Sequence, residues 1–234
     1  MNLRIAGYGM LLAVSYGAPL GAETMQLTFL EQERGIEPYQ VRMLVNEAFL
    51  RIDDGPDADG FLLMRRADGM VYSVTHDSKS VLDIPRHEVL AEPPIPVNPE
   101  EDYSAEPDAP LVGGKPVAAY RQHFNGETCF SAVVAEGLVP DVRAAMTELN
   151  KTLGGQQMQT LGNFPPESIT ACLLARLVYA RQTFLERGFP ILEWDETGYR
   201  RQLLDFRPVD DMPADVFVIP EGYRHYEIGA AIPL

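Results

Sequence analysis

The chain has 234 residues, enough for one large domain or two small ones with a substantial apolar core. Its composition, 46% hydrophobic and 23% charged, is that of a folded protein and excludes a chain that is disordered throughout. The formal net charge of -15 predicts an acidic surface that repels phosphate backbones, which argues against a protein that binds nucleic acid.

The first 22 residues have the three parts of a secretory signal peptide. Arg4 supplies the positive charge, residues 5–17 form an apolar stretch, and small residues before Glu23 provide a cleavage site after about Ala22. The apolar stretch is shorter than the roughly 20 residues of a membrane-spanning helix. We therefore expect an exported, periplasmic protein whose mature chain has no transmembrane segment; the alternative is an uncleaved anchor helix.

The following 60 or so residues alternate apolar and polar side chains, which is the pattern of half-buried β-strands. We expect strands at 24–29, 40–46, 48–52, 61–64, 70–75 and 80–84. The apolar positions change phase near Asn46, which predicts a bulge or a tight turn. Ala67-Asp68-Gly69 predicts a hairpin, because an Asp-Gly pair tolerates the positive φ angles of a type I′ turn.

The segment from Arg51 to Phe61 reads RIDDGPDADGF and concentrates aspartate and glycine between two of these strands. An EF-hand loop needs oxygen ligands at its positions 1, 3, 5 and 12 and a glycine at position 6. With Gly60 at position 6, Gly55 falls at position 1 and Arg66 at position 12, so two ligand positions fail. We interpret the segment as a turn, for which Asp and Gly are typical residues, and predict no metal site.

Residues 85–116 contain a run of prolines among many acidic side chains. Proline lacks a backbone donor and is excluded from central strands. We therefore expect an acidic, proline-rich loop that is either mobile or laid over the surface.

The second half of the chain combines further strands with two helices. We expect strands at 117–124, 128–135, 190–194, 199–206, 217–219 and 223–228, with Asn125-Gly126 as a hairpin turn. One helix begins at Asp141, has an apolar stripe at helical spacing and ends at Gly154-Gly155. A second helix runs from about Pro166 to Arg187, where Gly188 ends it. Short turns between the strands indicate antiparallel pairing, so the fold class is α+β.

Candidate catalytic and metal-binding residues lack the spacing that such sites need. The four histidines show neither i, i+4 spacing nor the cysteine spacing of a zinc site. They are His76, His87, His123 and His225. Glu193, Asp195 and Glu196 surround the lone Trp194 in the manner of a glycosidase pair, but carboxylates in a turn are usually solvated. We therefore predict that the protein is not an enzyme and uses no cofactor.

Cys129 and Cys172 are the only cysteines, and the sequence leaves their state open. An oxidising compartment favours a disulfide, which would stabilise the fold by about 4 kcal/mol. The alternative is a pair of buried free thiols, because spacing alone does not show that the side chains meet. A nucleophilic Cys129 beside His123 is less favoured, since a second cysteine in an exported protein points to the bridge.

Several short segments together resemble a family of uncharacterised exported proteins related to the periplasmic lipoprotein-carrier superfamily. These segments are Leu50–Asp53, Phe61–Arg66, Gly69–Tyr72, Asp77–Ser80, Gly126–Cys129 and Asp215–Tyr223. The resemblance implies a single domain over residues 23–234. It further implies a strongly curved antiparallel sheet, an unclosed β-barrel, with two helices covering its concave side. The proline-rich segment and the two cysteines depart from the carrier pattern.

The resemblance and the apolar stripes together predict an exported, non-catalytic protein that holds an apolar ligand in the cell envelope. The expected ligand is a lipid or acyl chain, free or on a lipoprotein, and the sequence does not identify the residues that bind it. The alternative is an envelope sensor or interaction module that binds another protein through the acidic proline-rich loop at about 85–116.

Overall fold

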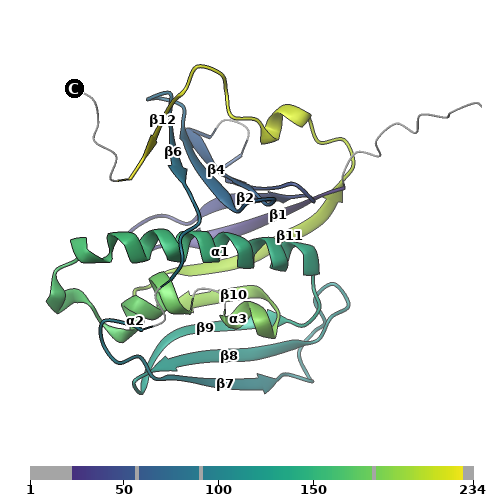
Figure 1. Ribbon diagram of the computed structural model, residues 1–234. Helices are drawn as coiled ribbons and strands as arrows, with labels where there is room; N and C mark the ends of the chain where they lie inside the picture. Colours follow the sequence, from purple (N-terminus) through teal and green to yellow (C-terminus); the bar gives the residue numbers. More distant parts are fainter. Residues whose placement is uncertain (1–22, 56–57, 90–91, 181–182, 229–234) are drawn as a thin grey trace, which may run out of the picture.

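The computed structural model describes residues 23–228, except 56–57, 90–91 and 181–182. The expected signal peptide, residues 1–22, lies outside the described residues. The described chain forms one twelve-stranded sheet with its α-helices along one face (Figure 1). Among the described residues, no helix is both long and apolar enough to span a membrane.

Most strands that follow one another in sequence are also neighbours in the sheet, whose order is β12-β6-β5-β4-β3-β2-β1-β11-β10-β9-β8-β7. The strands are β1 (Thr24–Gln32), β2 (Tyr39–Val45), β3 (Phe49–Asp53), β4 (Gly60–Arg65), β5 (Met70–Thr75), β6 (Ser80–Ile84), β7 (Pro99–Ala105), β8 (Val117–Phe124), β9 (Glu127–Ala135), β10 (Phe189–Asp195), β11 (Arg200–Val209) and β12 (Arg224–Glu227). Adjacent strands are antiparallel, except that β12 runs parallel to β6. The mostly antiparallel sheet is therefore as predicted, and it does not close on itself.

The turns between strands follow from their residues. Asn125 and Gly126 both have positive φ angles, 53° and 82°, as the predicted hairpin turn requires. The phase change near Asn46 is a tight turn, in which the Asn46 side chain accepts hydrogen bonds from the amides of Ala48 and Phe49. The hairpin at Gly69 is also confirmed, but only Gly69 has a positive φ, so its turn is not type I′.

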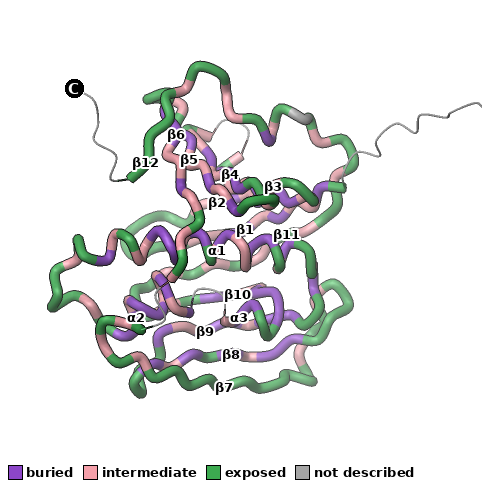
Figure 2. The backbone as a smooth tube through the Cα atoms, in the orientation of Figure 1, coloured by how far each residue is buried: buried purple, intermediate pink, exposed green. Residues whose placement is uncertain are grey.

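We had expected the proline-rich acidic segment to be a loop throughout, but part of it forms a strand. Residues Pro99–Ala105 form β7, the edge strand that pairs with β8, and all of β7 is exposed (Figure 2). Proline is compatible with the first residue of an edge strand, because no neighbour needs its missing N–H. The sequence conceals β7 because a strand exposed on both faces shows no alternation of apolar and polar residues.

The helices occupy one side of the sheet in two groups. The long helix α1 (Pro140–Thr160) packs against β2, β5 and β6, and crosses the middle of Figure 1. The short helices α2 (Ala171–Leu174) and α3 (Thr183–Arg187) pack against β8, β9 and β10, and the π-helix η3 (Ala175–Tyr179) joins α2 to the side of α1. The predicted second helix is thus broken, and its first turn begins only after Thr170, whose hydroxyl accepts a hydrogen bond from Leu173 N.

Short 3₁₀-helices complete the chain. They are η1 (Leu161–Asn163), η2 (Pro166–Ser168) and η4 (Ala214–Phe217). The predicted strand at 217–219 is therefore wrong. Phe217 instead ends η4 and packs on the sheet, where its ring stacks on that of Phe49 with centroids 5.6 Å apart.

The core has two main parts on opposite faces of the sheet. The larger part lies between α1 and the strands and includes Leu27, Phe29, Met43, Val45, Met146 and Leu149. The second part lies beneath the C-terminal segment and includes Leu44, Phe61, Val74 and Phe217. Because successive side chains of a strand point to opposite faces, Met43, Leu44 and Val45 are all buried only when both faces are covered.

Helix α1 continues through Gly154-Gly155, where we had predicted its end. The chain after β6 crosses α1 at this point, and a Cβ on Gly155 would lie 2.3 Å from the carbonyl oxygen of His87. The hydroxyl of Thr152 donates to the carbonyl oxygen of Gly69 at 2.7 Å on the same side of the helix. Gly155 is therefore explained by close approach of two backbones, a contact that only tertiary structure creates.

The substitution Gly155→Ala is expected to lower the free energy of unfolding by about 2 kcal/mol, although alanine is the better helix former. The added methyl group meets backbone, which cannot rotate away as a side chain can. Urea unfolding followed by circular dichroism measures the change. Gly162→Ala is the matched control, because a Cβ there meets nothing within 4 Å. An unchanged or raised stability of Gly155→Ala would contradict the close crossing.

Candidate functional site

A pocket of about 600 Å³ lies between α1, η3 and the covered face of the sheet. Its apolar walls come from both layers and include Met43, Phe130, Met146, Leu149, Leu153 and Phe184. The volume falls in the range of small-molecule sites, about 300–1,000 Å³.

The local sequence explains two of the walls. The apolar stripe predicted for α1 faces the sheet, and Met146, Leu149 and Leu153 from this stripe line the pocket. The opposite wall is η3, which contributes Ala175, Arg176 and Leu177. A π-helix is wider than an α-helix and is frequent at functional sites, and no pattern in the sequence predicted it.

One end of the pocket is polar and is built on the sheet itself. Arg201 in β11 stands directly opposite Glu31 in β1 and Glu193 in β10. Its guanidinium lies 3.0 Å from Glu193 and 4.0 Å from Glu31. We call these three residues the Glu31–Arg201–Glu193 ladder. All three side chains are largely buried, and the Arg201 guanidinium also lies 4.8 Å from the centre of the Phe29 ring.

Burial sets the electrostatics of the ladder. It raises the pKa of Glu193, and the nearby Arg201 offsets this only in part. Burial raises the pKa of Glu31 too, against the lowering effects of Arg201 and of hydrogen bonds from Tyr199 and Tyr39. The second oxygen of Glu193, Oε2, is buried and has no hydrogen-bond partner among the described residues. Such an acceptor costs about 1–3 kcal/mol.

Asp195, two residues along the same strand, is engaged within the protein. Its Oδ1 accepts hydrogen bonds from the amide and hydroxyl of Thr197 and from the Tyr199 amide. Its Oδ2 accepts one from Arg176 of η3 at 3.2 Å, so Asp195 joins η3 to the turn between β10 and β11. The sequence analysis placed the carboxylates around Trp194 in solvent. This is wrong for Glu193 and Asp195, whose side chains are largely buried, whereas Glu196 and Trp194 are exposed.

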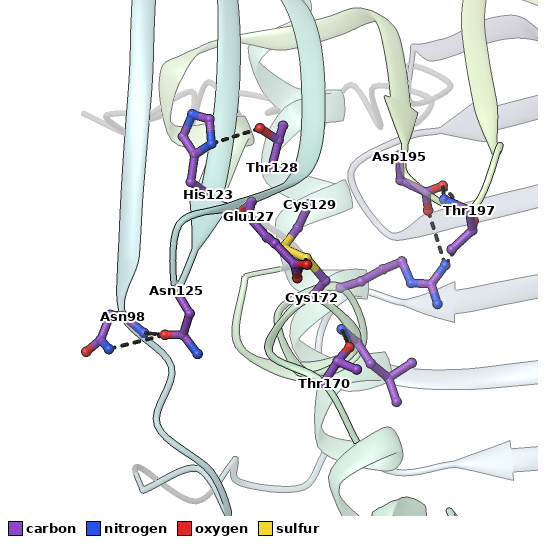
Figure 3. Close-up of a disulfide and its surroundings, with 12 residues drawn as sticks. Asn98, His123, Asn125, Glu127, Thr128, Cys129, Thr170, Cys172, Asp195 and Thr197 are labelled. Carbon is purple, nitrogen blue, oxygen red and sulfur yellow. Dashed lines mark hydrogen bonds and ion pairs between the residues drawn. A yellow bond between two sulfur atoms is a disulfide. The ribbon is translucent and has the colours of Figure 1, made fainter. Parts of the chain in front are cut away.

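Cys129 of β9 and Cys172 of α2 form a disulfide, with Cα atoms 5.1 Å apart (Figure 3). Of the two interpretations left open by the sequence, the bridge is confirmed, and a nucleophilic Cys129 is excluded because its sulfur is bonded. His123 instead contacts Asp102 at 3.0 Å and Thr128 at 2.9 Å. Cys129 also lines the pocket, so the bridge anchors the helical wall to the sheet beside it.

The remaining histidines lie apart from one another. His76 contacts the hydroxyl of Tyr223 at 2.7 Å, His225 contacts Asp83 at 2.8 Å, and His87 lies at the crossing over α1. Within the described ranges, no group of three or more His, Cys, Asp or Glu side chains is arranged to hold a metal ion.

The aspartate-rich segment is a turn between β3 and β4, as predicted, and two of its residues, 56–57, are outside the described part. Its first aspartate, Asp53, is the informative one. The Asp53 carboxylate is fully buried and paired with Arg42 at 2.8 Å and Arg51 at 2.5 Å, and it accepts a hydrogen bond from the Gly55 amide. This arrangement stabilises the turn and leaves Asp53 no role as a metal ligand.

Sequence reasoning missed Glu31 and Arg201. One signal was present for Glu31: it continues the inward-facing series of Leu27 and Phe29, because side chains two apart share a face. An acid at an inward position of a strand indicates a buried partner. Its partner Arg201 belongs to a strand near the other end of the chain, so sequence alone could not identify it.

No protein-family model matches the chain, and no curated protein matches it. Among solved structures, an uncharacterised conserved protein from Thermus thermophilus is similar over 88% of this chain and 91% of its own, at 9% identity and a TM-score of 0.45. PNGF-II is similar in two crystal forms, over 88% of this chain at 9% and 8% identity, with TM-scores of 0.44 and 0.42. This chain spans 31% and 32% of those PNGF-II chains. Similarity at this level identifies neither a family nor a function.

Proposed function

We propose that this protein is an exported, non-catalytic binding protein that holds the apolar part of a lipid or acyl chain between α1 and the sheet. The observation that carries the proposal is the pocket of about 600 Å³, in which methionine, leucine and phenylalanine side chains from α1 and the sheet form apolar walls beside a polar end. Apolar walls combined with polar groups held in fixed positions are the usual form of a ligand pocket.

The relationship to the lipoprotein-carrier superfamily belongs to the same proposal. In it, the covered face is the concave side of a strongly curved sheet. Contacts from the helical layer to strands on both sides of β1 support this: α1 touches β5 and β6, whereas α2 and α3 touch β8, β9 and β10. A flat sheet would hold these groups of strands far apart, because neighbouring strands are about 4.8 Å apart.

The hydrogen bonds of Asp195 within the protein support a role in ligand binding and not in catalysis. Hydrolysis by paired carboxylates requires one acid and one base or nucleophile that are both free to reach the substrate. Both oxygens of Asp195 accept hydrogen bonds from the protein, and Glu31 is held by Arg201 and Tyr39. Of Glu31, Asp195 and Glu193, only Glu193 has a buried oxygen without a hydrogen-bond partner among the described residues.

Filling the pocket tests the proposal. Leu153 lies in α1, is half-buried and lines the pocket, so the larger side chain of Leu153→Trp should extend into the space. We expect the variant to bind an uncharged apolar fluorophore, N-phenyl-1-naphthylamine, about tenfold or more weakly, which is the effect of losing roughly 1.4 kcal/mol of contact. Titration followed by fluorescence gives the dissociation constants.

The matched control is Lys151→Trp, which places the same side chain at an exposed position of α1. This variant should bind the fluorophore as the wild-type protein does. Native mass spectrometry of the purified protein supplies a second readout, in which a co-purified lipid is expected. If the wild-type protein neither takes up the fluorophore nor carries a lipid, the ligand pocket is refuted.

The exposed edge strand favours one alternative, an interaction module that binds another protein. The outer edge of β7 is exposed and acidic, through Glu100, Glu101 and Asp102, and could pair with a basic strand of a partner. Charged edge strands also serve simply to prevent aggregation. If a Glu100→Lys variant retains the same bound proteins as the wild type, the outer edge of β7 is not the binding surface.

A further inference from the structure

The charged side chains at the polar end of the pocket determine which ligand head group can bind there, provided that the pocket holds a ligand as proposed. The Glu31–Arg201–Glu193 ladder contains two carboxyl groups and one guanidinium, all largely buried. Two further arginines line the pocket, but Arg176 of η3 is paired with Asp195 and Arg34 is exposed. With both carboxylates ionised, the ladder therefore has one negative charge that Arg201 does not neutralise.

Glu193 is the ladder residue that lines the pocket together with Arg201. Arg201 contacts its Oε1 at 3.0 Å, whereas its Oε2 is buried without a hydrogen-bond partner among the described residues. A buried carboxylate oxygen in this condition is stabilised by a donor, and most strongly by a charged donor. Burial raises the pKa of Glu193, and the neighbouring Glu31 and Asp195 add to this effect, so a cationic donor would favour the ionised form.

We propose that the pocket binds an amphiphile with a primary ammonium head, which donates a hydrogen bond to the Glu193 carboxylate while its apolar chain lies along α1. The head brings the positive charge that the ladder lacks and an N–H donor for the Glu193 carboxylate. A carboxylate head would instead be repelled by Glu193 and Glu31, because Arg201 is already shared between them. A quaternary ammonium head would bring the charge but no donor.

The experiment displaces N-phenyl-1-naphthylamine from the wild-type protein with three twelve-carbon competitors at pH 7, below their micelle concentrations. The competitors are dodecylamine, dodecyltrimethylammonium and dodecanoate. We expect dodecylamine to bind about tenfold or more tightly than either of the others, which is the effect of one charge-assisted hydrogen bond. The comparison with dodecyltrimethylammonium separates the hydrogen bond from attraction of any cation to this acidic protein.

Two variants test whether Glu193 accepts the hydrogen bond from the ammonium head. Glu193→Gln should abolish the preference for dodecylamine over dodecyltrimethylammonium, whereas Glu196→Gln should keep it. Glu196 is the matched control because it is exposed, lies in the adjacent turn and gives the same change of charge. If Glu193→Gln does not fold, the three competitors on the wild-type protein decide the question alone.

The outcomes distinguish this inference from the proposed function. Failure of the fluorophore itself to bind would overturn both. Fluorophore binding with dodecanoate equal to or better than dodecylamine would overturn the head-group inference and leave the apolar pocket standing. Equal binding of dodecylamine and dodecyltrimethylammonium would overturn the hydrogen bond to Glu193, as would a retained preference in a folded Glu193→Gln variant.

Discussion

Replacement of Asp53 by asparagine is expected to lower the free energy of unfolding by about 3–5 kcal/mol at neutral pH. The Asp53 side chain is fully buried, and the Arg42 and Arg51 side chains around it are largely buried. Arg42 donates two hydrogen bonds of 2.8 Å to the two carboxylate oxygens. Asparagine has nearly the same shape but no charge, so both guanidinium groups lose the anion that balances them.

The effect should extend beyond the turn between β3 and β4. Arg51 also donates to the carbonyl oxygen of Val216 and lies over the Phe61 ring, with its guanidinium carbon 3.8 Å from the ring centre. Val216 and Phe61 belong to the part of the core beneath the C-terminal segment. Loss of the Asp53 charge therefore loosens the anchoring of that segment as well as the turn itself.

The pH dependence of the effect has a definite sign. Burial alone would raise the pKa of Asp53, but hydrogen bonds and charge from Arg42 and Arg51 outweigh it, so the folded pKa lies below the ordinary value of 3.8. A depressed folded pKa contributes stability above the unfolded pKa, and this contribution is lost as pH falls through the folded value. The stability difference between the wild type and Asp53→Asn should therefore be full at pH 6–7 and shrink below about pH 4.

Urea unfolding at a series of pH values, followed by circular dichroism, measures this difference. Asp54→Asn is the matched control, because the neighbouring aspartate is exposed and its replacement should change stability by less than about 0.5 kcal/mol. Equal losses for the two variants, or a loss at Asp53 that does not depend on pH, would show that the buried ion pairs do not stabilise the fold.

Removal of the disulfide is expected to have the second large effect. The bridge joins residues 43 apart in sequence, and in the chain-entropy model it stabilises the folded state by about 4 kcal/mol. The double variant Cys129→Ala, Cys172→Ala should lose this amount in urea unfolding. Because the bridge connects β9 to α2 beside the pocket, we also expect weaker binding of N-phenyl-1-naphthylamine to the double variant.

A reducing agent provides the control for this prediction. It should shift the unfolding midpoint of the wild-type protein towards that of the double variant and leave the double variant unchanged. Thiol titration of the denatured protein establishes that reduction is complete. A wild-type protein that is fully reduced yet equally stable would mean that the bridge adds nothing to the stability of the fold.

Local pattern was sufficient for most strands and their turns. Alternation with a period of two predicted β1 to β6, and the sequence also predicted β8 to β11, all within a few residues of their observed bounds. The Asn125-Gly126 turn and the tight turn at Asn46 followed from residues that favour those conformations. The sequence analysis did not predict β7, because this strand is exposed on both faces. It also did not predict the break in the helix after Thr170, because apolar spacing does not distinguish one helix from several short ones.

The pocket and its polar end could not be predicted from local sequence pattern. Their residues come from β1, β2, β3, β8, β9, β10, β11, α1, η3 and α3, and they meet only through the order and register of strands distant in sequence. Gly155 illustrates the same limit: a glycine in a helical pattern predicts a helix end, and only the crossing chain at His87 shows why the helix continues. The acids near Trp194 were assigned to solvent because the sequence carries no information on what covers a given strand.

The sequence by itself determined the class of the fold, the positions of most strands, the face of α1 that is buried and the turn character of the aspartate-rich segment. These properties depend on neighbouring residues, whose side-chain period and turn preferences act over a few residues. Tertiary structure alone decided the disulfide, the Glu31–Arg201–Glu193 ladder, the parallel pairing of β12 with β6, and the pocket. Each of these joins segments far apart in the chain, and such contacts are set by packing and strand register rather than by local preference.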